Sequence, residues 1–326
     1  MSSLPLFSVS EFTTWDLSFE QDVALYRRLG VTGIEVCERK ISRDPAKAHE
    51  QLAWLRDRGL QVTSVQPRVH ALFKDSMCPE LEDPRERMRR YRQSIDLFGD
   101  CFPGQNLPLV TIGGNAPAHN FRLAYETAHR LYPDLARYAA DHGVRIMFEP
   151  LHPVLMNADT FVCSLEDALR LIDAVNQPNF GLMLDVWHVW HEHDIARRLA
   201  VLPRPPMAVH ICDWPRLGPR GPADRVLPGQ GSINLPALLG GLEAAGYQGA
   251  YCLEVFSAHQ WPDSLWRRDP AEVLAAGREG FYNAWRNRSR SAVASTGLGS
   301  GRERLPPVSP VARPADGKRN RRDGSG

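Results

Sequence analysis

The sequence lacks the features that mark several classes of protein. Its six cysteines include no C-x-x-C pair, and several lie in apolar, strand-like runs where a thiol behaves as a small hydrophobic group. No apolar run approaches the ~18 residues of a membrane span, and no basic region followed by a long apolar stretch opens the chain. These absences predict a cytoplasmic protein that has no membrane partner and keeps its cysteines reduced.

Excess charge of one sign is also missing from the whole chain, but it is present in its parts. Lysine and arginine number 39 against 38 acidic residues. From Arg286 onward there are ten basic and three acidic residues, so the end of the chain carries +7 and the remainder carries −6. Because phosphate contacts require clustered lysine and arginine, the acidic body argues against a nucleic-acid partner.

Short apolar runs alternate with amphipathic segments from Leu6 to about Trp285, a pattern typical of a parallel sheet built from βα units. The predicted strands are Leu6–Ser10, Gly33–Cys37, Gln61–Gln66, Leu107–Ile112, Val144–Glu149, Phe180–Asp185, Met207–Cys212 and Ala250–Val255. The predicted helices include Phe19–Leu29, Ala46–Arg58, Asp83–Phe98, Phe121–His142, Leu165–Val175, Leu235–Ala245 and Pro270–Trp285. Eight repeats favour a closed (β/α)8 barrel, which takes roughly 250 residues, over an open sheet.

We therefore assign residues 1–286 to one barrel. Residues 287–326 are rich in serine, glycine, proline and arginine and show no periodicity, which predicts a disordered basic tail.

Four residues that metal ions favour end or closely follow strand-like runs. They are Glu149 in VRIMFE, Asp185 in FGLMLD, His210 in MAVH and Glu254 in AYCLE. The carboxyl ends of parallel strands open into the mouth of an α/β barrel, where such folds place their chemistry. Three carboxylates and one imidazole suit Mn²⁺ or Mg²⁺, tolerate Co²⁺ and would also accept Zn²⁺. The four together therefore predict a site for one divalent ion.

Taken singly, these residues have ordinary explanations. A lone histidine such as His210 is more often a satisfied core residue, and the D-x-x-H spacing of Asp185 and His188 has many chance matches. Glu254 is the hardest to explain without a ligand, because an acid inside an apolar run must be paired or bound.

The ordered series FEP, LDVWH, AVH and LEVFS resembles the xylose isomerase-like TIM-barrel superfamily, the group of sugar phosphate isomerases and epimerases. The resemblance covers the chain from about Leu6 to Trp285. It implies that Glu149, Asp185, His210 and Glu254 bind one divalent metal and that Glu149 and Glu254 also move protons. It further implies that His188 contacts the substrate.

The stretch DRVLPGQG resembles the family's arginine-containing loop, so Arg225 is the expected substrate-binding arginine. Barrels of this kind often pair through loops at the mouth, and a homo-oligomer is left open.

The implied chemistry is proton abstraction next to a carbonyl through an enediolate. Return of the proton to the same carbon is epimerisation, return to the neighbouring carbon is isomerisation, and loss of a β-hydroxyl is dehydration. An isomerase or epimerase of a ketose, sugar or polyol-derived ketone is preferred, and a lyase acting on an inosose or on dehydroshikimate is the main alternative. A barrel that only binds a sugar has little use for both glutamates, and a DNA-repair nuclease of the endonuclease IV type needs further histidines that are missing here.

Weaker candidates surround this set. Glu35 ends the second strand and is at least as easily a structural anchor as a catalytic group. His152 follows Glu149 closely and would suit a place behind a ligand. Four tryptophans lie on or near the mouth loops, where they would stack on a substrate or fill the core: Trp187, Trp190, Trp214 and Trp261. Three residues after the third strand are further candidates for the mouth: Gln66, Arg68 and His70.

Overall fold

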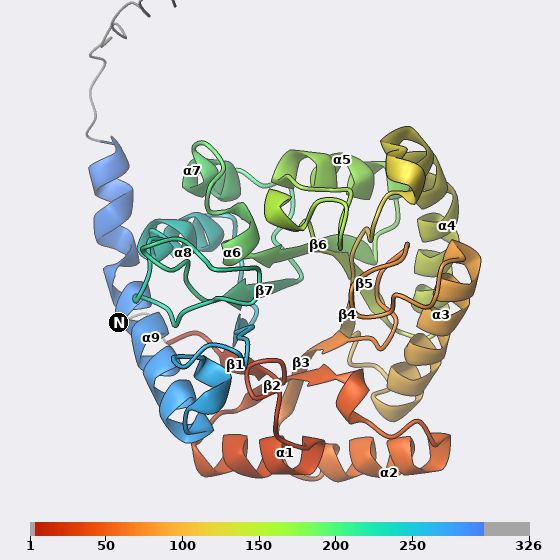
Figure 1. Ribbon diagram of the computed structural model, residues 1–326, viewed down its shortest axis with the longest axis horizontal. Helices are drawn as coiled ribbons and strands as arrows, with labels where there is room; N and C mark the ends of the chain where they lie inside the picture. Colours follow the sequence, from red (N-terminus) through yellow and green to blue (C-terminus); the bar gives the residue numbers. More distant parts are fainter. Residues whose placement is uncertain (1–3, 297–326) are drawn as a thin grey trace, which may run out of the picture.

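The computed structural model describes residues 4–296, and these residues form a closed barrel of parallel strands inside a ring of helices (Figure 1). Each strand pairs with the next along the chain, and β8 pairs with β1 to close the barrel. The strands are β1 (Phe7–Ser10), β2 (Gly33–Cys37), β3 (Gln61–Gln66), β4 (Pro108–Thr111), β5 (Arg145–Phe148), β6 (Phe180–Asp185), β7 (Ala208–Ile211) and β8 (Tyr251–Leu253). The predicted (β/α)8 barrel is confirmed, with strand ends within about two residues of those expected.

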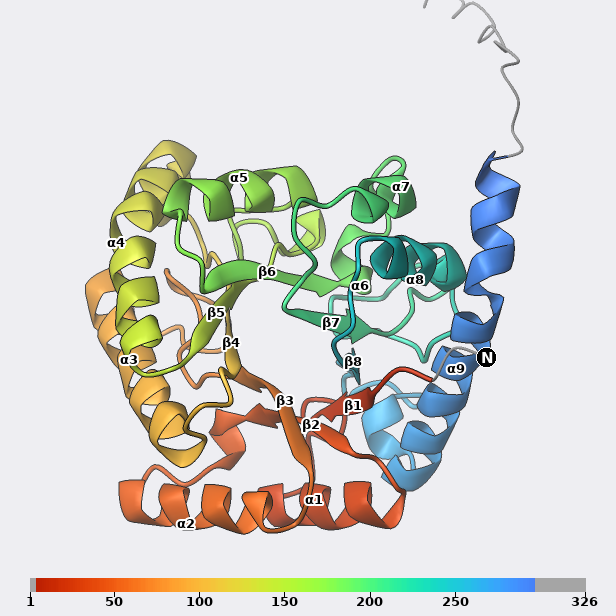
Figure 2. The same ribbon diagram turned by 180° about the vertical axis from the view of Figure 1, so that it is seen from behind.

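The helices cover the outside of the barrel, as the view from behind also shows (Figure 2). They are α1 (Phe19–Arg28), α2 (Pro45–Arg56), α3 (Pro84–Cys101), α4 (Phe121–Asp141), α5 (Leu165–Val175), α6 (Val186–Val189), α7 (Ile195–Ala200), α8 (Leu235–Ala244) and α9 (Pro270–Thr296). The short helices α6 and α7 follow β6 and were not among the predicted elements.

Local sequence explains where the helices begin and end. Ser18 and Gln21 form a capping box at the start of α1. Asp83 caps α3, and Pro84 occupies its first turn, where a missing backbone N–H costs nothing. Past the end of α4, Gly143 adopts a φ of 66°, which a residue with a Cβ rarely adopts.

The core has two layers, one between strands and helices and one inside the barrel. The outer layer is a large cluster of buried apolar side chains contributed by all eight strands and the covering helices. Inside the barrel, a smaller cluster joins Val110, Met147, Met183 and Ala208. This apolar plug closes the interior below the mouth.

Strand periodicity places polar residues directly above the plug. Side chains two positions apart point to the same face of a strand, so Glu149 lies above Met147 and Asp185 above Met183. His210 lies above Ala208 by the same rule. Each of these polar residues is at least nine-tenths buried. Along these three strands, the side chains inside the barrel thus change from apolar to ionisable over two residues.

Helix α9 continues to Thr296, ten residues past the predicted start of the tail. Between Phe281 and Thr296 the sequence contains neither proline nor glycine, so no residue interrupts the helix. The rest of the predicted tail, 297–326, lies outside the described residues. Among residues 4–296, none of the helices has both the length and the apolar character that crossing a membrane requires.

Candidate active site

Strand register brings the four predicted metal ligands to one place at the mouth. Asp185 at the end of β6 is the direct ladder partner of His210 in β7. Glu149 and Glu254 come directly after β5 and β8. Ligand atoms of Asp185, His210 and Glu254 all lie within 4.8 Å of one another, and so do those of Glu149, Asp185 and His188. These two groups share Asp185, so the predicted ligands and His188 surround one point.

His210 is oriented by Glu35 on the other side of the imidazole ring. Its Nε2 lies 2.8 Å from Oε2 of Glu35, which also accepts a hydrogen bond from the Ser64 hydroxyl at 2.7 Å. Burial would raise the pKa of Glu35, but His210 and these hydrogen bonds lower it below its ordinary value. A carboxylate there fixes the Nε2 proton and leaves Nδ1 facing the centre. Glu35 is thus the anchor that the sequence allowed, and it acts through His210.

Two buried polar atoms at the centre make no hydrogen bond of good geometry within the described residues. They are Nδ1 of His210 and Oε1 of Glu149, which lie 4.0 Å apart. Oε2 of Glu254 is 3.1 Å from the same Nδ1. Burying such atoms unpaired is costly, and one cation between them would satisfy both. The donor set therefore fits a divalent ion.

A second grouping of potential ligands fits a metal less well. Glu35, His210 and Cys252 also lie close together. However, burial raises the pKa of the Cys252 thiol to about 12, which disfavours the thiolate that a metal needs. The Glu35 carboxylate is already bound by Ser64 and His210.

Arg225 reaches the centre from the loop between β7 and α8. Its Nη1 donates to Oδ2 of Asp185 at 2.6 Å and to Oε2 of Glu254 at 3.1 Å. The guanidinium lies 4.8 Å from the ring of Trp187 and 4.9 Å from the ring of Phe256. The structure thus places Arg225 beside two of the predicted ligands.

Asp213 holds the loop that carries Arg225. Its carboxylate accepts hydrogen bonds from four backbone N–H groups, at Trp214, Gly229, Gly231 and Ile233. Gly231 is close-packed there, since an added Cβ would lie 2.3 Å from an Asp213 oxygen. The turn at residues 228–231 (PGQG) therefore helps to hold Arg225 in position.

His188 presents a defined face to the centre. The backbone N–H of His152 donates to its Nδ1 at 2.9 Å, so the neutral ring carries its proton on Nε2. Nε2 lies 3.5 Å from Asp185 and 3.8 Å from Glu149. Burial lowers the pKa of His188 to about 3. His152 does support this residue, but it does so through its backbone N–H and not through its imidazole ring.

The carboxylates of the centre differ in their electrostatics. Burial raises the pKa of Glu149 well above its ordinary value, and the charges of Glu254 and Asp185 add to this effect. Burial acts on Asp185 in the same direction, but the positive charge of Arg225 and the hydrogen bond from the Trp187 N–H oppose it, and the pKa of Asp185 is lowered. Burial therefore favours the protonated form of Glu149, and the surroundings of Asp185 favour its carboxylate.

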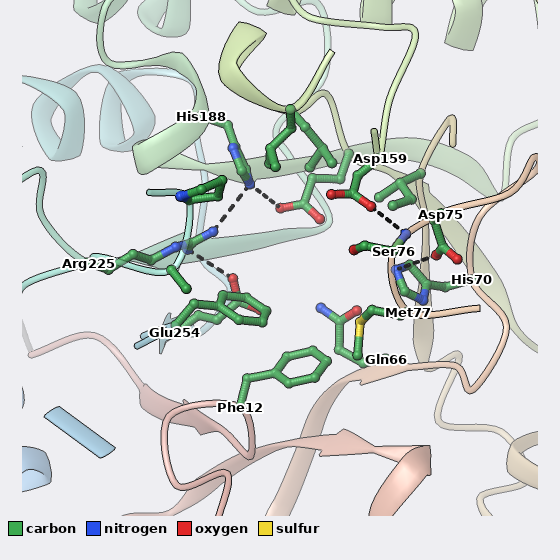
Figure 3. A pocket seen from close by; sticks show the side chains of 17 residues that line it. Phe12, Gln66, His70, Asp75, Ser76, Met77, Asp159, His188, Arg225 and Glu254 are labelled. Atoms are coloured by element: carbon green, nitrogen blue, oxygen red, sulfur yellow. Dashed lines mark hydrogen bonds and ion pairs between the residues drawn. The ribbon is translucent and has the colours of Figure 1, made fainter. Parts of the chain in front are cut away.

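The centre opens into a cavity of about 230 Å³ with two polar sides (Figure 3). Glu254, His188 and Arg225 lie on one side, and Gln66, His70, Asp75, Ser76 and Asp159 lie on the other. Glu149 belongs to the first side, since its Oε1 is 3.8 Å from Nε2 of His188. Apolar side chains, including Phe12 and Phe256, fill the lining between them. Sequence reasoning missed Asp75 and Asp159, because both lie in loops without periodicity. None of the four candidate tryptophans lines this cavity in the described part of the chain.

Comparison with known proteins agrees with the barrel fold. Residues 23–280 match the family described as xylose isomerase-like TIM barrel. The chain belongs to this family. The crystal structure of protein SMc04130 from Sinorhizobium meliloti superposes with a TM-score of 0.72 at 25% identity and covers 86% of this chain and 98% of that one.

Two curated relatives of this family member carry names of enzymes. A 3-dehydroshikimate dehydratase of Pseudomonas aeruginosa is 27% identical over 241 residues, which are 70% of this chain and 34% of the dehydratase. An inosose isomerase of Halalkalibacterium halodurans is 30% identical over 130 residues, 38% of this chain and 43% of the isomerase. The chain thus spans about a third of the first relative and less than half of the second.

Proposed function

We propose that this protein is a divalent-metal-dependent isomerase or epimerase of a ketose, sugar or polyol-derived ketone. The observation that carries the proposal is the cluster of buried ligand atoms at the centre, in which Nδ1 of His210 and Oε1 of Glu149 make no hydrogen bond of good geometry and lie beside two further carboxylates. The family contains sugar isomerases and epimerases, and one relative is named as an inosose isomerase.

Glu149, Asp185, His210 and Glu254 would hold the metal. When bound, the ion supplies an electrophile that polarises a substrate carbonyl and stabilises the developing negative charge, an effect worth several kcal/mol. The hard donor set favours Mn²⁺ or Mg²⁺, with Co²⁺ or Zn²⁺ as alternatives.

Glu149 and Glu254 are suited to move the proton. They follow β5 and β8, which are separated by two strands, so they approach the cavity from different directions. One carboxylate removes the proton next to the carbonyl, and the other returns a proton to the same or the neighbouring carbon. A positioned carboxylate contributes roughly 10² to 10⁴-fold as a general base. Nε2–H of His188 and the guanidinium of Arg225 would contact substrate oxygens.

Dehydration is the second candidate, favoured by the 27% identity to a 3-dehydroshikimate dehydratase. The same proton abstraction followed by loss of a β-hydroxyl gives a lyase, and the proposed ligand set is compatible with both outcomes.

Deuterium incorporation tests the proposal. Purified protein loaded with Mn²⁺ is incubated in D₂O with a panel of ketoses, inososes and 3-dehydroshikimate, and exchange is followed by proton NMR after removal of the ion. We expect deuterium at the carbon next to the carbonyl of at least one ketone with wild type and almost none with Glu254→Gln. The product separates isomerase from lyase. No exchange from any of these ketones with the loaded protein would contradict the proposal.

A further inference from the structure

The side of the cavity away from the candidate metal ligands is built from three loops that are fastened together. The loop after β3 pairs with the end of β4, because Leu72 donates from its backbone N–H to Ile112 at 3.0 Å and Ile112 donates to His70 at 3.2 Å. Gly114, in the loop after β4, donates to the carbonyl of Asp159 in the loop after β5 at 2.9 Å. A network of this kind holds side chains in place without a ligand.

Arg87 fixes the first of these loops from below. This fully buried residue of α3 donates to the carbonyls of Ala71, Cys78 and Leu81 and, through Nη2, to Oδ1 of Asp75 at 3.0 Å. The same Oδ1 accepts the backbone N–H of Cys78 at 2.8 Å. Both interactions use one oxygen of Asp75, so the carboxylate is charge-paired while its second oxygen is left over.

That second oxygen and His70 form an incomplete pair. Oδ2 of Asp75 has no hydrogen-bond partner within the described residues, and only 3% of the residue is exposed to solvent. Its distance to Nε2 of His70 is 3.9 Å, too long for a direct hydrogen bond. His70 is 6% exposed, and both residues line the cavity (Figure 3). Burial lowers the pKa of His70, which keeps the ring neutral.

A hydroxyl group is the chemistry that completes this pair. It can donate to Oδ2 of Asp75 and accept from an N–H of His70 at the same time, whereas a carboxylate only accepts and would face Asp75 as a second anion. We propose that His70 and Asp75, held by Arg87, bind a substrate hydroxyl remote from the reacting carbons and select neutral polyhydroxy ketones over acids. This assignment deepens the proposed function and rests on it.

The charged residues that line the cavity also favour a neutral substrate over an acid. Among its described lining residues, Arg225 is the one lysine or arginine, and it is already paired with Asp185 and Glu254. Asp159 adds a carboxylate on the far side. The far side of the described lining therefore offers two carboxylates, Asp75 and Asp159, and no lysine or arginine. A substrate carboxylate placed on that side would therefore meet two acids and no lysine or arginine that could pair with it.

Calorimetry on full-length, Mn²⁺-loaded protein tests this, with myo-inositol as the neutral probe and 3-dehydroshikimate as the acid. Asp75→Asn keeps an oxygen for Cys78 and Arg87 but replaces the free acceptor with a donor. We expect it to weaken myo-inositol binding by about tenfold and to strengthen 3-dehydroshikimate binding. His70→Gln should also weaken myo-inositol, whereas Lys74→Gln, an exposed substitution in the same loop, should not. Mn²⁺ affinity should stay at the wild-type value throughout.

A set of monodeoxy inositols separates contact from structure. For the isomer that lacks the hydroxyl in question, wild type should bind weakly and Asp75→Asn should add no further loss, whereas a merely structural role would weaken every ligand and the metal alike. The inference is overturned if both variants bind myo-inositol as wild type does, or if wild type binds 3-dehydroshikimate more tightly. If the binding results hold but no ketone exchanges its proton, the proposed reaction is wrong and the hydroxyl site stands.

Discussion

The two polar sides of the cavity are built differently. On the side of β5 to β8, each proposed ligand lies in a strand or directly follows one, and barrel closure alone brings the residues together. On the opposite side, His70, Asp75 and Asp159 come from loops and depend on Arg87 and on backbone hydrogen bonds for their positions. The first side is thus specified by strand periodicity and the second by tertiary contacts. We therefore expect substitutions of surrounding residues to displace the side chains of the first side less than those of the second.

The largest effect is expected from Glu149→Gln, on the strand-built side. The amide cannot act as a base, so the rate of deuterium exchange should fall by about 10² to 10⁴-fold. Because the strands of the barrel position Glu149, replacing its carboxylate should leave the melting temperature within a few degrees of wild type. Exchange and thermal unfolding are measured beside Glu126→Gln, an exposed control on α4. Equal exchange rates in the two variants would remove Glu149 from the mechanism.

Arg87→Gln tests the opposite side of the cavity, which is built from loops. Removing one partner of a buried ion pair costs about 3–5 kcal/mol of unfolding free energy, and three carbonyl contacts are lost as well. Urea unfolding measures the loss. Arg137→Gln, which breaks the exposed pair with Asp134 on α4, should cost less than about 1 kcal/mol. Similar losses in both variants would show that Arg87 does not hold the loop.

Glu35→Gln tests a residue that acts through a ligand. A weaker hold on the Nε2 proton of His210 should lower Mn²⁺ affinity by about 10 to 100-fold in calorimetry. Glu38→Gln is the matched control, since Glu38 is also a buried glutamate but contacts Ser94 and the backbone of Arg68. It should reduce stability while leaving Mn²⁺ affinity unchanged. A metal affinity that falls equally in both variants would contradict the positioning role.

The smallest effect concerns Glu11, a buried acid between β1 and α1 that lies outside the cavity lining. Burial raises its pKa well above 4.5, and the charge of Asp22 adds to this. The folded state therefore retains a proton that the unfolded chain releases, so this group's contribution to stability is full below pH 4.5 and declines as pH rises through the raised pKa. Glu11→Gln should flatten that decline, measured by urea unfolding from pH 4.5 to 8. An unchanged slope would show that Glu11 is ionised in the folded protein.

The fold and the strand-built side follow from sequence because both depend on short-range patterns. Runs such as FGLMLD identify a buried strand and also the residue that ends it, and closure then places Asp185 beside His210. Asp75 and Asp159 could not be predicted this way, since neither lies in a periodic segment. The sequence allowed Glu35 to be an anchor but could not name its partner, because the contact with His210 spans 175 positions of sequence.

Anomalous diffraction from a crystal of the Mn²⁺-loaded protein tests the central claim most directly. The account predicts one manganese peak per chain, within bonding distance of Glu149, Asp185, Nδ1 of His210 and Glu254. A peak at Glu35 and Cys252 instead, or no peak at the barrel mouth after loading, would contradict the proposed metal centre.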